Sequence, residues 1–499
     1  MSLIAGISKI TVTPLTEKQL RHVISNDTGE NAAFFLQLFK RIAELEWSLL
    51  FDTAGSEKSN GRFNIMVWNP ALVVTAKEGQ TELIDIQQQK RYDLDEKPFE
   101  ASEKYLHAHV VKLRATIDVK FEHLPFIVGV AGMAGYDAGR FYESLPSKAL
   151  NDYTTPDFAA GLYLNSFIED TKTGTFYYCS TDDSTFPDIL DTELDNKPTS
   201  PACSSNGASE ATSDKKTFSI TEPFASNLSQ EEYERCIDAI HRYLKAGDCY
   251  QVNMAQRFTA RFQGDFYSAY CRLRNENQAP FSAYFKLPES AIASISPERF
   301  LSVKEGLVET KPIKGTRPRY AEKQRDAESA YALQHAEKDR SENLMIVDLL
   351  RNDISKHCKP GSVNVPALFA LESYEAVHHL VSTITGELAE GSTPLDLLAS
   401  SFPGGSITGA PKIRAMEVID ELEPHRRNIY CGSIFYMGCR EDMDSSICIR
   451  TVLAEDDKLH CWAGGGIVLD SQADEEYQET LDKVSKIVPV LAKFNEKNE

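Results

Sequence analysis

Alternating apolar and polar positions predict strands in the first part of the chain. Short runs of this kind cover residues 62–68, 161–164 and 176–178, and a period of two is typical of strands that bury one face. Apolar positions at helical spacing cover 30–48 and 101–117. The pattern predicts a mixed domain of helices and mostly antiparallel strands over residues 1–181.

Residues 182–215 break this pattern, because Ser, Thr, Asp, Asn and Pro dominate the segment. Such a composition buries too little apolar surface to offset the entropy that ordering costs. We expect a low-complexity connector without chemistry of its own. It divides the chain into the N-terminal domain and a second domain over 216–499.

The second domain opens with an amphipathic helix over 229–246, where Ser229 and Glu232 have the spacing of a capping box. A run of strands is predicted from Tyr250 to Thr310, and within it the segment 300–310 reads as two short strands around Glu305-Gly306. Helical periodicity returns over 328–350 and 474–494. Helices and antiparallel strands in this order indicate an α+β protein.

The charge excludes some partners. With 53 Lys and Arg against 74 Asp and Glu, the formal net charge is −21, which disfavours binding to nucleic acid or anionic lipid. No apolar run approaches the roughly 20 residues that cross a bilayer, and the ten cysteines form no C-x-x-C pair. We expect a cytoplasmic protein with reduced thiols.

Lys314 is the first candidate for chemistry. It follows Pro312, which confines the chain to an extended conformation, and precedes Gly315, which permits a tight turn. A lysine becomes a nucleophile only when its pKa falls well below about 10.4, through burial or a nearby cation. The alternative is a solvated lysine in a turn.

Glu298 lies shortly before Lys314 in the run Ser-Pro-Glu-Arg-Phe. A hairpin over 300–310 would bring this carboxyl group close to the lysine amine. A carboxyl group beside an amine can transfer protons, whereas the simpler interpretation is a surface charge of little energetic weight.

Three further carboxylates lie on helix faces. Glu342 shares a face with Met345 and Leu349 and needs a partner if that face packs, either a metal ion or Lys338 one turn earlier. Helical spacing aligns another group beside an apolar stripe, namely Glu476, Glu479 and Lys483. Position near a helix start explains such carboxylates equally well.

The run Gly464-Gly465-Gly466 precedes that last helix and leaves backbone N–H groups accessible to a carboxylate or phosphate. Oxygen ligands on helices, completed by waters, suit Mg²⁺. A second Gly-rich segment, 402–412, opens a helix at Pro411 and either binds an anion or caps the helix. It is not a phosphate-binding P-loop, since Ala410-Pro411 replaces the Lys-Ser/Thr pair.

Taken together, these motifs resemble the chorismate-utilising enzymes, a family that includes anthranilate, aminodeoxychorismate, isochorismate and salicylate synthases. The resemblance spans about residues 225–490, with seven motifs in the family's order: 247–253, 296–300, 312–316, 342–353, 378–383, 402–412 and 464–480. It implies an α+β fold of the anthranilate synthase type, a sandwich of two mostly antiparallel sheets flanked by helices.

Two positions separate reactions within the family. Isochorismate and salicylate synthases typically carry a lysine where this chain has Gln251, and anthranilate synthases typically carry an alanine where it has Lys314. The Pro-Ile-Lys-Gly-Thr run resembles the aminodeoxychorismate branch. The family's tryptophan pocket surrounds a Leu-Leu-x-Ser run, from which Leu49 to Thr53 depart.

Roles carried over by the resemblance make Lys314 the nucleophile and Glu298 its general acid. Mg²⁺ would be held by Glu342, Glu476 and Glu479. The substrate, chorismate, would be bound by a larger set, which comprises Gln251, Thr316, His379, Tyr430, Arg450, Gly465, Gly466 and Lys483.

The implied reaction converts chorismate and ammonia to 4-amino-4-deoxychorismate, a precursor of 4-aminobenzoate and folate, through a covalent Lys314 intermediate. Ammonia would come from a separate glutamine amidotransferase subunit. Two alternatives remain open, an anthranilate synthase large subunit and a non-catalytic chorismate-binding regulatory subunit.

Overall fold

The structure is a computed structural model that describes residues 7, 9–20, 34–55, 61–181, 217–374 and 377–494. The predicted connector, 182–215, lies outside the described residues, as do 30–33 of the first predicted helix and Cys203. No helix among the described residues is long and apolar enough to cross a membrane.

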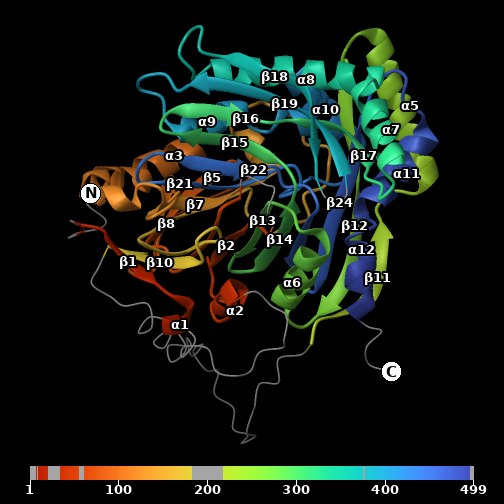
Figure 1. Cartoon of the computed structure of the whole chain (residues 1–499). Helices are drawn as coiled ribbons and strands as arrows, with labels where there is room; N and C mark the ends of the chain where they lie inside the picture. The colour runs from red at the N-terminus through yellow and green to blue at the C-terminus, as the bar shows by residue number, and fades with distance from the viewer. Residues whose placement is uncertain are drawn as a thin grey trace, which may run out of the picture.

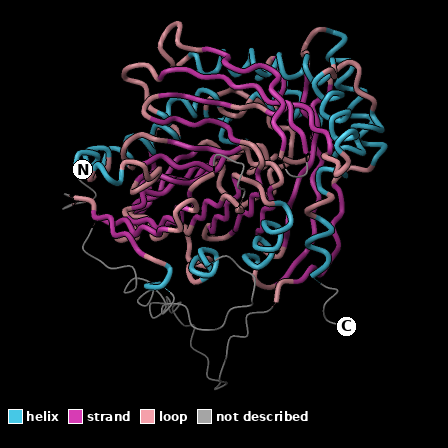
Figure 2. The backbone as a smooth tube through the Cα atoms, in the orientation of Figure 1, coloured by secondary structure: helices cyan, strands magenta, loops and turns pink. Residues whose placement is uncertain are grey.

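Two large sheets form the centre of the molecule, and every strand pairing in them is antiparallel over the described residues. In Figure 2 the strands fill the interior and helices lie at the outside. The predicted α+β sandwich is therefore confirmed. In spatial order, the first sheet contains β1 (Thr11–Leu15), β10 (Thr175–Ser180), β9 (Asn165–Asp170), β3 (Phe63–Val67), β2 (Leu49–Asp52), β13 (Phe281–Lys286), β14 (Ser290–Ser296), β23 (Thr451–Glu455), β24 (Lys458–Ile467), β12 (Gln251–Gln263) and β11 (Ser219–Ser226), with β20 (Gly409–Ala410) on β12.

The second sheet follows the same antiparallel rule. Its order is β17 (Ile313–Pro318), β19 (Val377–Glu387), β16 (Leu307–Thr310), β15 (Arg299–Lys304), β22 (Met443–Ser446), β21 (Ser433–Gly438), β7 (Gly129–Ala134), β8 (Phe158–Tyr163), β4 (Leu72–Lys77), β5 (Gln80–Asp85) and β6 (Lys90–Leu94), with β18 (Asn364–Ser373) on β19.

Strands from both halves of the chain are neighbours in each sheet. In the first sheet β2 pairs with β13, and in the second β7 pairs with β21. Figure 1 shows the strands of the first half lying beside those of the second. The main apolar core fills the space between the sheets and draws on both halves, for example Val67, Val130, Ile292 and Ile434. The domain boundaries given above stay a prediction.

Helices cover the outer faces of the sheets. A second apolar cluster packs α2, α6 and α12 on the first sheet, and a third packs α5 and α10 against β12. The helices are α1 (Glu17–Leu20), α2 (Phe34–Lys40), α3 (Pro98–Tyr105), α5 (Gln230–Ala246), α6 (Phe266–Asn277), α7 (Lys323–Gln334), α8 (Glu337–Ser355), α9 (Pro394–Ser401), α10 (Lys412–Leu422), α11 (Ala473–Val484) and α12 (Val488–Ala492).

Several predicted elements are confirmed. The capping box at Ser229 is formed by both of its reciprocal hydrogen bonds, and β3, β8 and β10 overlap the three predicted strand runs. The hairpin of β15 and β16 turns at Glu305 and Gly306, whose φ angles of 52° and 78° suit a tight two-residue turn.

The long predicted helices are shorter in the structure. The segment 328–350 is divided between α7 and α8 by His335 and Ala336, and 474–494 is divided between α11 and α12, where Pro489 occupies the first turn. Residues after α3 continue as short 3₁₀ helices over His107–His109 and Val111–Thr116. The predicted strand run from Tyr250 to Thr310 also contains α6, whose start is capped by Asp265.

Candidate functional site

The site lies where the chain crosses between the two sheets. Glu298 sits in the connection from β14 of the first sheet to β15 of the second, and Arg450 in the return from β22 to β23. The two connections are joined, because the backbone N–H of Ile447 donates to the carbonyl of Glu298 at 3.0 Å. An acid and a cation from distant parts of the sequence are thus fixed at one edge of the core.

Lys314 projects from β17 into this region. Its Nζ donates to the carbonyl oxygen of Ser406 at 3.2 Å. Burial lowers the pKa of Lys314, while the charges of Glu342 and Glu298 oppose that effect. The lysine is therefore not a solvated turn residue. A buried amine with a lowered pKa is the form in which lysine acts as a nucleophile.

Glu298 is 7 % exposed, and burial raises its pKa to about 7, against the opposing charge of Lys314. It also accepts a hydrogen bond from the Ser406 hydroxyl at 3.3 Å. A carboxyl group with this pKa is about half protonated at pH 7 and can donate a proton there. The structure therefore brings the predicted acid and nucleophile within electrostatic reach of each other, as the hairpin predicted.

Three carboxylates lie on the helical side of the site. Burial raises the pKa of Glu342 on α8, whereas Lys314 lowers it. Glu476 is 4 % exposed and accepts from the Ser471 hydroxyl at 2.6 Å. Glu479 forms an ion pair with Lys483 at 2.5 Å. Although burial alone would raise the pKa of Glu479, Lys483 holds it below its usual value.

Ammonium groups lie against these carboxylates. Lys338 contacts Glu476 at 3.4 Å, so the alternative partner suggested for Glu342 forms its ion pair with a different carboxylate. Lys483 also donates to the carbonyl of Gly464 at 2.7 Å. Over the residues that the structure describes, no three His, Cys, Asp or Glu side chains form a ready-made metal cluster.

The glycines of β24 give the carboxylates room. A methyl group on Gly465 would lie 2.9 Å from Oε2 of Glu476 and 3.5 Å from Oε1 of Glu479, so both oxygens face the same point of the strand. A methyl group on Gly466 would lie 2.0 Å from Nε2 of Gln251. Gln251 is 1 % exposed, and its Oε1 has no hydrogen-bond partner among the described residues.

Arg450 is the cation of the site without a counter-charge. Among the described residues it has no ion pair or side-chain hydrogen bond, and burial lowers its pKa. Its φ angle of 51° places it in a region that non-glycine residues rarely adopt. A half-buried guanidinium without a counter-charge among the described residues is compensated best when it binds an anion. This arrangement fits a carboxylate ligand.

The remaining predicted residues line the same region. Thr316 and His379 are hydrogen-bonded, with 2.8 Å between Oγ1 and Nδ1. Burial, reinforced by Arg450, lowers the pKa of His379 to about 4, so its ring is neutral at neutral pH. Tyr430 is buried and stacks on Trp462 with 5.9 Å between the ring centroids.

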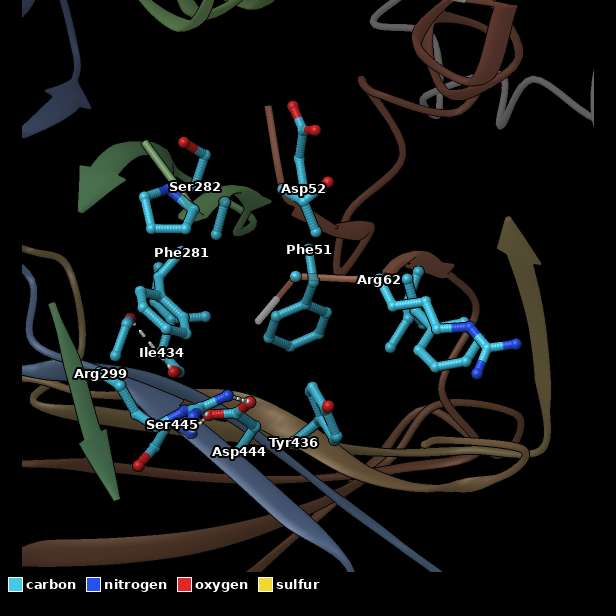
Figure 3. A pocket seen from close by; sticks show the side chains of 17 residues that line it. Phe51, Asp52, Arg62, Phe281, Ser282, Arg299, Ile434, Tyr436, Asp444 and Ser445 are labelled. Atoms are coloured by element: carbon cyan, nitrogen blue, oxygen red, sulfur yellow. Dashed lines mark hydrogen bonds and ion pairs between the residues drawn. The ribbon is translucent and has the colours of Figure 1, made fainter. Parts of the chain in front are cut away.

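A separate pocket lies between the sheets near β2, β13 and β21, and none of the predicted site residues lines it. Figure 3 shows Phe51 and Tyr436 beside its centre and the Arg299–Asp444 ion pair at its edge. Part of its wall is formed by Phe51, Asp52 and Thr53. These residues belong to the run 49–53, which departs from the Leu-Leu-x-Ser pattern. The carboxylate of Asp52 forms an ion pair with the guanidinium of Arg274, with 2.7 Å between Oδ2 and Nε.

Comparison with known proteins agrees with the geometry. The family of chorismate binding enzymes matches residues 51–489. The chain belongs to this family. It is 43 % identical to aminodeoxychorismate synthase component 1 of Escherichia coli (strain K12) over 91 % of the chain and 95 % of that protein. The relative of the same name in Bacillus subtilis (strain 168) is 32 % identical over 90 % and 93 %.

Anthranilate synthases are also relatives in sequence. Anthranilate synthase component 1 of Lactococcus lactis is 33 % identical over 94 % of the chain and 98 % of that protein. Among solved structures, anthranilate synthase component I from Streptococcus pneumoniae TIGR4 aligns with a TM-score of 0.71 at 26 % identity, covering 95 % of this chain and 97 % of that one. The fold expected from the resemblance is shared.

Sequence reasoning missed one residue of this site. Ser406 contacts both Lys314 and Glu298. The sequence pattern of its segment, 402–412, indicates only an anion-binding loop or a helix cap. The signal that could have pointed to it is its place between Gly405 and Ile407, in a loop too rich in glycine for an ordinary cap.

Proposed function

We infer that the protein is the chorismate-binding component of an aminodeoxychorismate synthase, which converts chorismate and ammonia to 4-amino-4-deoxychorismate. The observation that carries this inference is the pairing of half-buried Lys314 with buried Glu298, in which the lysine pKa is lowered and the carboxyl pKa is raised. The relatives of that name, matched over 95 % of the length of the one from Escherichia coli, support it.

The proposed mechanism starts with the neutral amine of Lys314 attacking ring carbon C2. The C4 hydroxyl group leaves as water when Glu298 donates its proton. Glu298, now a carboxylate, takes up the proton that Lys314 loses on forming the adduct. Ammonia then attacks C4, and the bond from C2 to Lys314 breaks as Glu298 returns that proton to the departing amine. The carboxylate finally takes a proton from the new ammonium group at C4. The net change is loss of water and gain of an amine at C4, with Glu298 restored as an acid.

Arg450 would bind one carboxylate of the substrate, and the backbone N–H groups of Gly465 and Gly466 another. The neutral ring of His379 and the hydroxyl of Thr316 would line the site, with Tyr430, Gln251 and Lys483 completing its walls. These groups hold the dianion so that C2 meets Lys314 and C4 meets Glu298.

We propose that Glu342, Glu476 and Glu479 hold Mg²⁺. Their oxygens suit this cation, and two of them converge on Gly465. Bound Mg²⁺ would polarise the ring carboxylate of chorismate. Lys338 forms an ion pair with Glu476 and would compete with Mg²⁺ for this carboxylate. Its side chain is 51 % exposed, so it can move away when the cation binds.

Ammonia would be supplied by a glutamine amidotransferase subunit, which the words "component 1" in the relatives' names imply. We also propose that the product feeds 4-aminobenzoate and folate synthesis. The direct test incubates the purified chain with chorismate, Mg²⁺ and ammonium and separates the products by chromatography. Anthranilate as the main product, or no turnover, would refute the assignment.

Arg450→Gln is expected to raise the KM for chorismate by about 10- to 100-fold, because a hydrogen bond to a charged group contributes roughly 1.5–3 kcal/mol. Thermal stability should change little, since this half-buried guanidinium has no ion pair to lose among the described residues. Steady-state kinetics and thermal unfolding measure both quantities. Arg351→Gln, which changes a half-exposed arginine on α8, is the control. An unchanged KM would contradict the role of Arg450.

Lys338→Met is expected to tighten Mg²⁺ binding about two- to fivefold, because a competing cation worth roughly 0.5–1 kcal/mol is removed. Titration calorimetry without chorismate measures this affinity independently of activity. Glu476→Gln should weaken binding in the same assay. Lys356→Met, just beyond the C-terminal end of α8, is the control. If Lys338→Met binds Mg²⁺ no more tightly than the parent protein, Lys338 does not compete with the cation.

A further inference from the structure

The loop between α9 and α10 passes through the site under close packing. A methyl group on Gly405 would lie 2.5 Å from Cδ2 of Leu349 on α8, and one on Gly404 would lie 2.9 Å from Cδ1 of Ile447. A larger residue at either position would force Leu349 or Ile447 to shift, so glycine suits this close approach. The loop is therefore held between α8 and the crossover that carries Arg450.

Hydrogen bonds fix the same loop from the other side. The buried guanidinium of Arg427 donates to the carbonyl of Ile407 at 3.0 Å, and the backbone N–H of Asn253 on β12 donates to the carbonyl of Thr408 at 2.8 Å. The Thr408 hydroxyl closes the turn by donating to the carbonyl of Gly404 at 3.0 Å. The loop is a rigid support for the side chain it presents.

That side chain is Ser406, which is 9 % exposed. Its carbonyl accepts from Nζ of Lys314 at 3.2 Å, and its hydroxyl donates to Oε1 of Glu298 at 3.3 Å. We propose that Ser406 is a positioning residue that aligns the nucleophile and the acid from one rigid point. This inference rests on the proposed function, in which Lys314 and Glu298 react with the same substrate.

The two contacts of Ser406 can be separated by mutation. The carbonyl contact to Lys314 belongs to the backbone and survives any substitution that leaves the loop in place. The hydroxyl contact to Glu298 belongs to the side chain, and it stabilises the charged form of the carboxyl group. Losing the hydroxyl should leave Lys314 in place, loosen Glu298 and raise the pKa of Glu298.

Other charged and titratable groups act on Glu298 and stay constant in this comparison. Lys314 on β17 and Lys483 on α11 both lower its pKa. The thiol of Cys431, whose own pKa Glu298 helps to raise, faces it from the turn before β21. A shift seen on changing Ser406 alone can then be assigned to the lost hydroxyl.

The test is the pH profile of ammonia-dependent kcat/KM for Ser406→Ala and Ser406→Thr. We expect Ser406→Ala to lower the plateau about 3- to 10-fold, as for one neutral hydrogen bond, and to move the fall of activity at high pH upward. Ser406→Thr keeps a hydroxyl group and should restore the position of that fall. Ser400→Ala, which removes a half-buried hydroxyl that donates to the carbonyl of Leu397 within α9, is the matched control.

An alanine variant with the profile of the parent protein, or one that threonine does not restore, would overturn the inference. If Ser406→Ala fails to fold by thermal unfolding, Ser406→Cys gives the second reading, because a thiol donates weakly and should shift the profile in the same direction by less. The proposed function fails separately, when the parent protein makes no 4-amino-4-deoxychorismate or when Lys314 and Glu298 variants remain active.

Discussion

Lys314→Ala is expected to abolish 4-amino-4-deoxychorismate formation, with a loss of roughly 10³-fold or more, because the reaction loses the atom that attacks C2. With C2 left open, ammonia can attack it directly, and anthranilate is expected to appear as a minor product. Chromatography of reactions with chorismate, Mg²⁺ and ammonium measures both outcomes. Mass spectrometry of the quenched parent protein should detect an adduct on Lys314.

The control for this variant is Lys304→Ala, which removes an exposed lysine from the end of β15 on the adjacent hairpin. It should leave product formation unchanged. Substantial 4-amino-4-deoxychorismate from Lys314→Ala would exclude a covalent role for the lysine. If Lys314→Ala is inactive and has also lost its thermal unfolding transition, the variant is not folded. Lys314→Met, which preserves the approximate length of the side chain, then takes its place in the test.

Glu298→Gln is expected to lower kcat by about 10²- to 10⁴-fold, the range typical of a general acid. The parent protein should lose activity as the pH rises through about 7, because Glu298 then gives up the proton that the leaving hydroxyl needs. That fall should vanish in the Gln variant, which has no proton to lose at this position. Profiles of kcat/KM against pH test the prediction in the free protein.

Glu309→Gln serves as the control, since this partly exposed carboxylate lies on the same hairpin and pairs with Arg299 at 3.3 Å. Its profile should match that of the parent protein. A fall at high pH that persists in Glu298→Gln would assign the titration to another group. In the opposite direction, protonation of Lys314 should reduce activity at low pH, because its amine must be neutral to attack.

Much of this site could be predicted from the sequence, because its groups lie in contiguous motifs whose residue types suit the chemistry. Lys314 and Glu298 are joined by a hairpin whose turn is visible in Glu305-Gly306. The stripe of Glu476, Glu479 and Lys483 follows from helical spacing alone, and the structure places Glu479 and Lys483 in contact.

Other features depend on contacts between distant segments, which local periodicity does not report. The contacts of Ser406 join residues 92 and 108 positions apart. The pairing of Lys338 with Glu476 joins α8 to α11, whereas spacing suggested a partner within one helix. Helix ends were also missed where apolar spacing continues through a break, as at His335 and Ala336.

The pairing of β2 with β13 has a consequence for how the chain reaches its native state. Residues 49–52 can complete their pairing in the first sheet only with residues 282–285. In the second sheet, β7 likewise pairs with β21. Contacts so far apart in sequence carry a large loop-closure entropy and slow folding. During synthesis the early strands therefore expose unpaired edges until the late ones emerge, which makes this stage the one most open to aggregation.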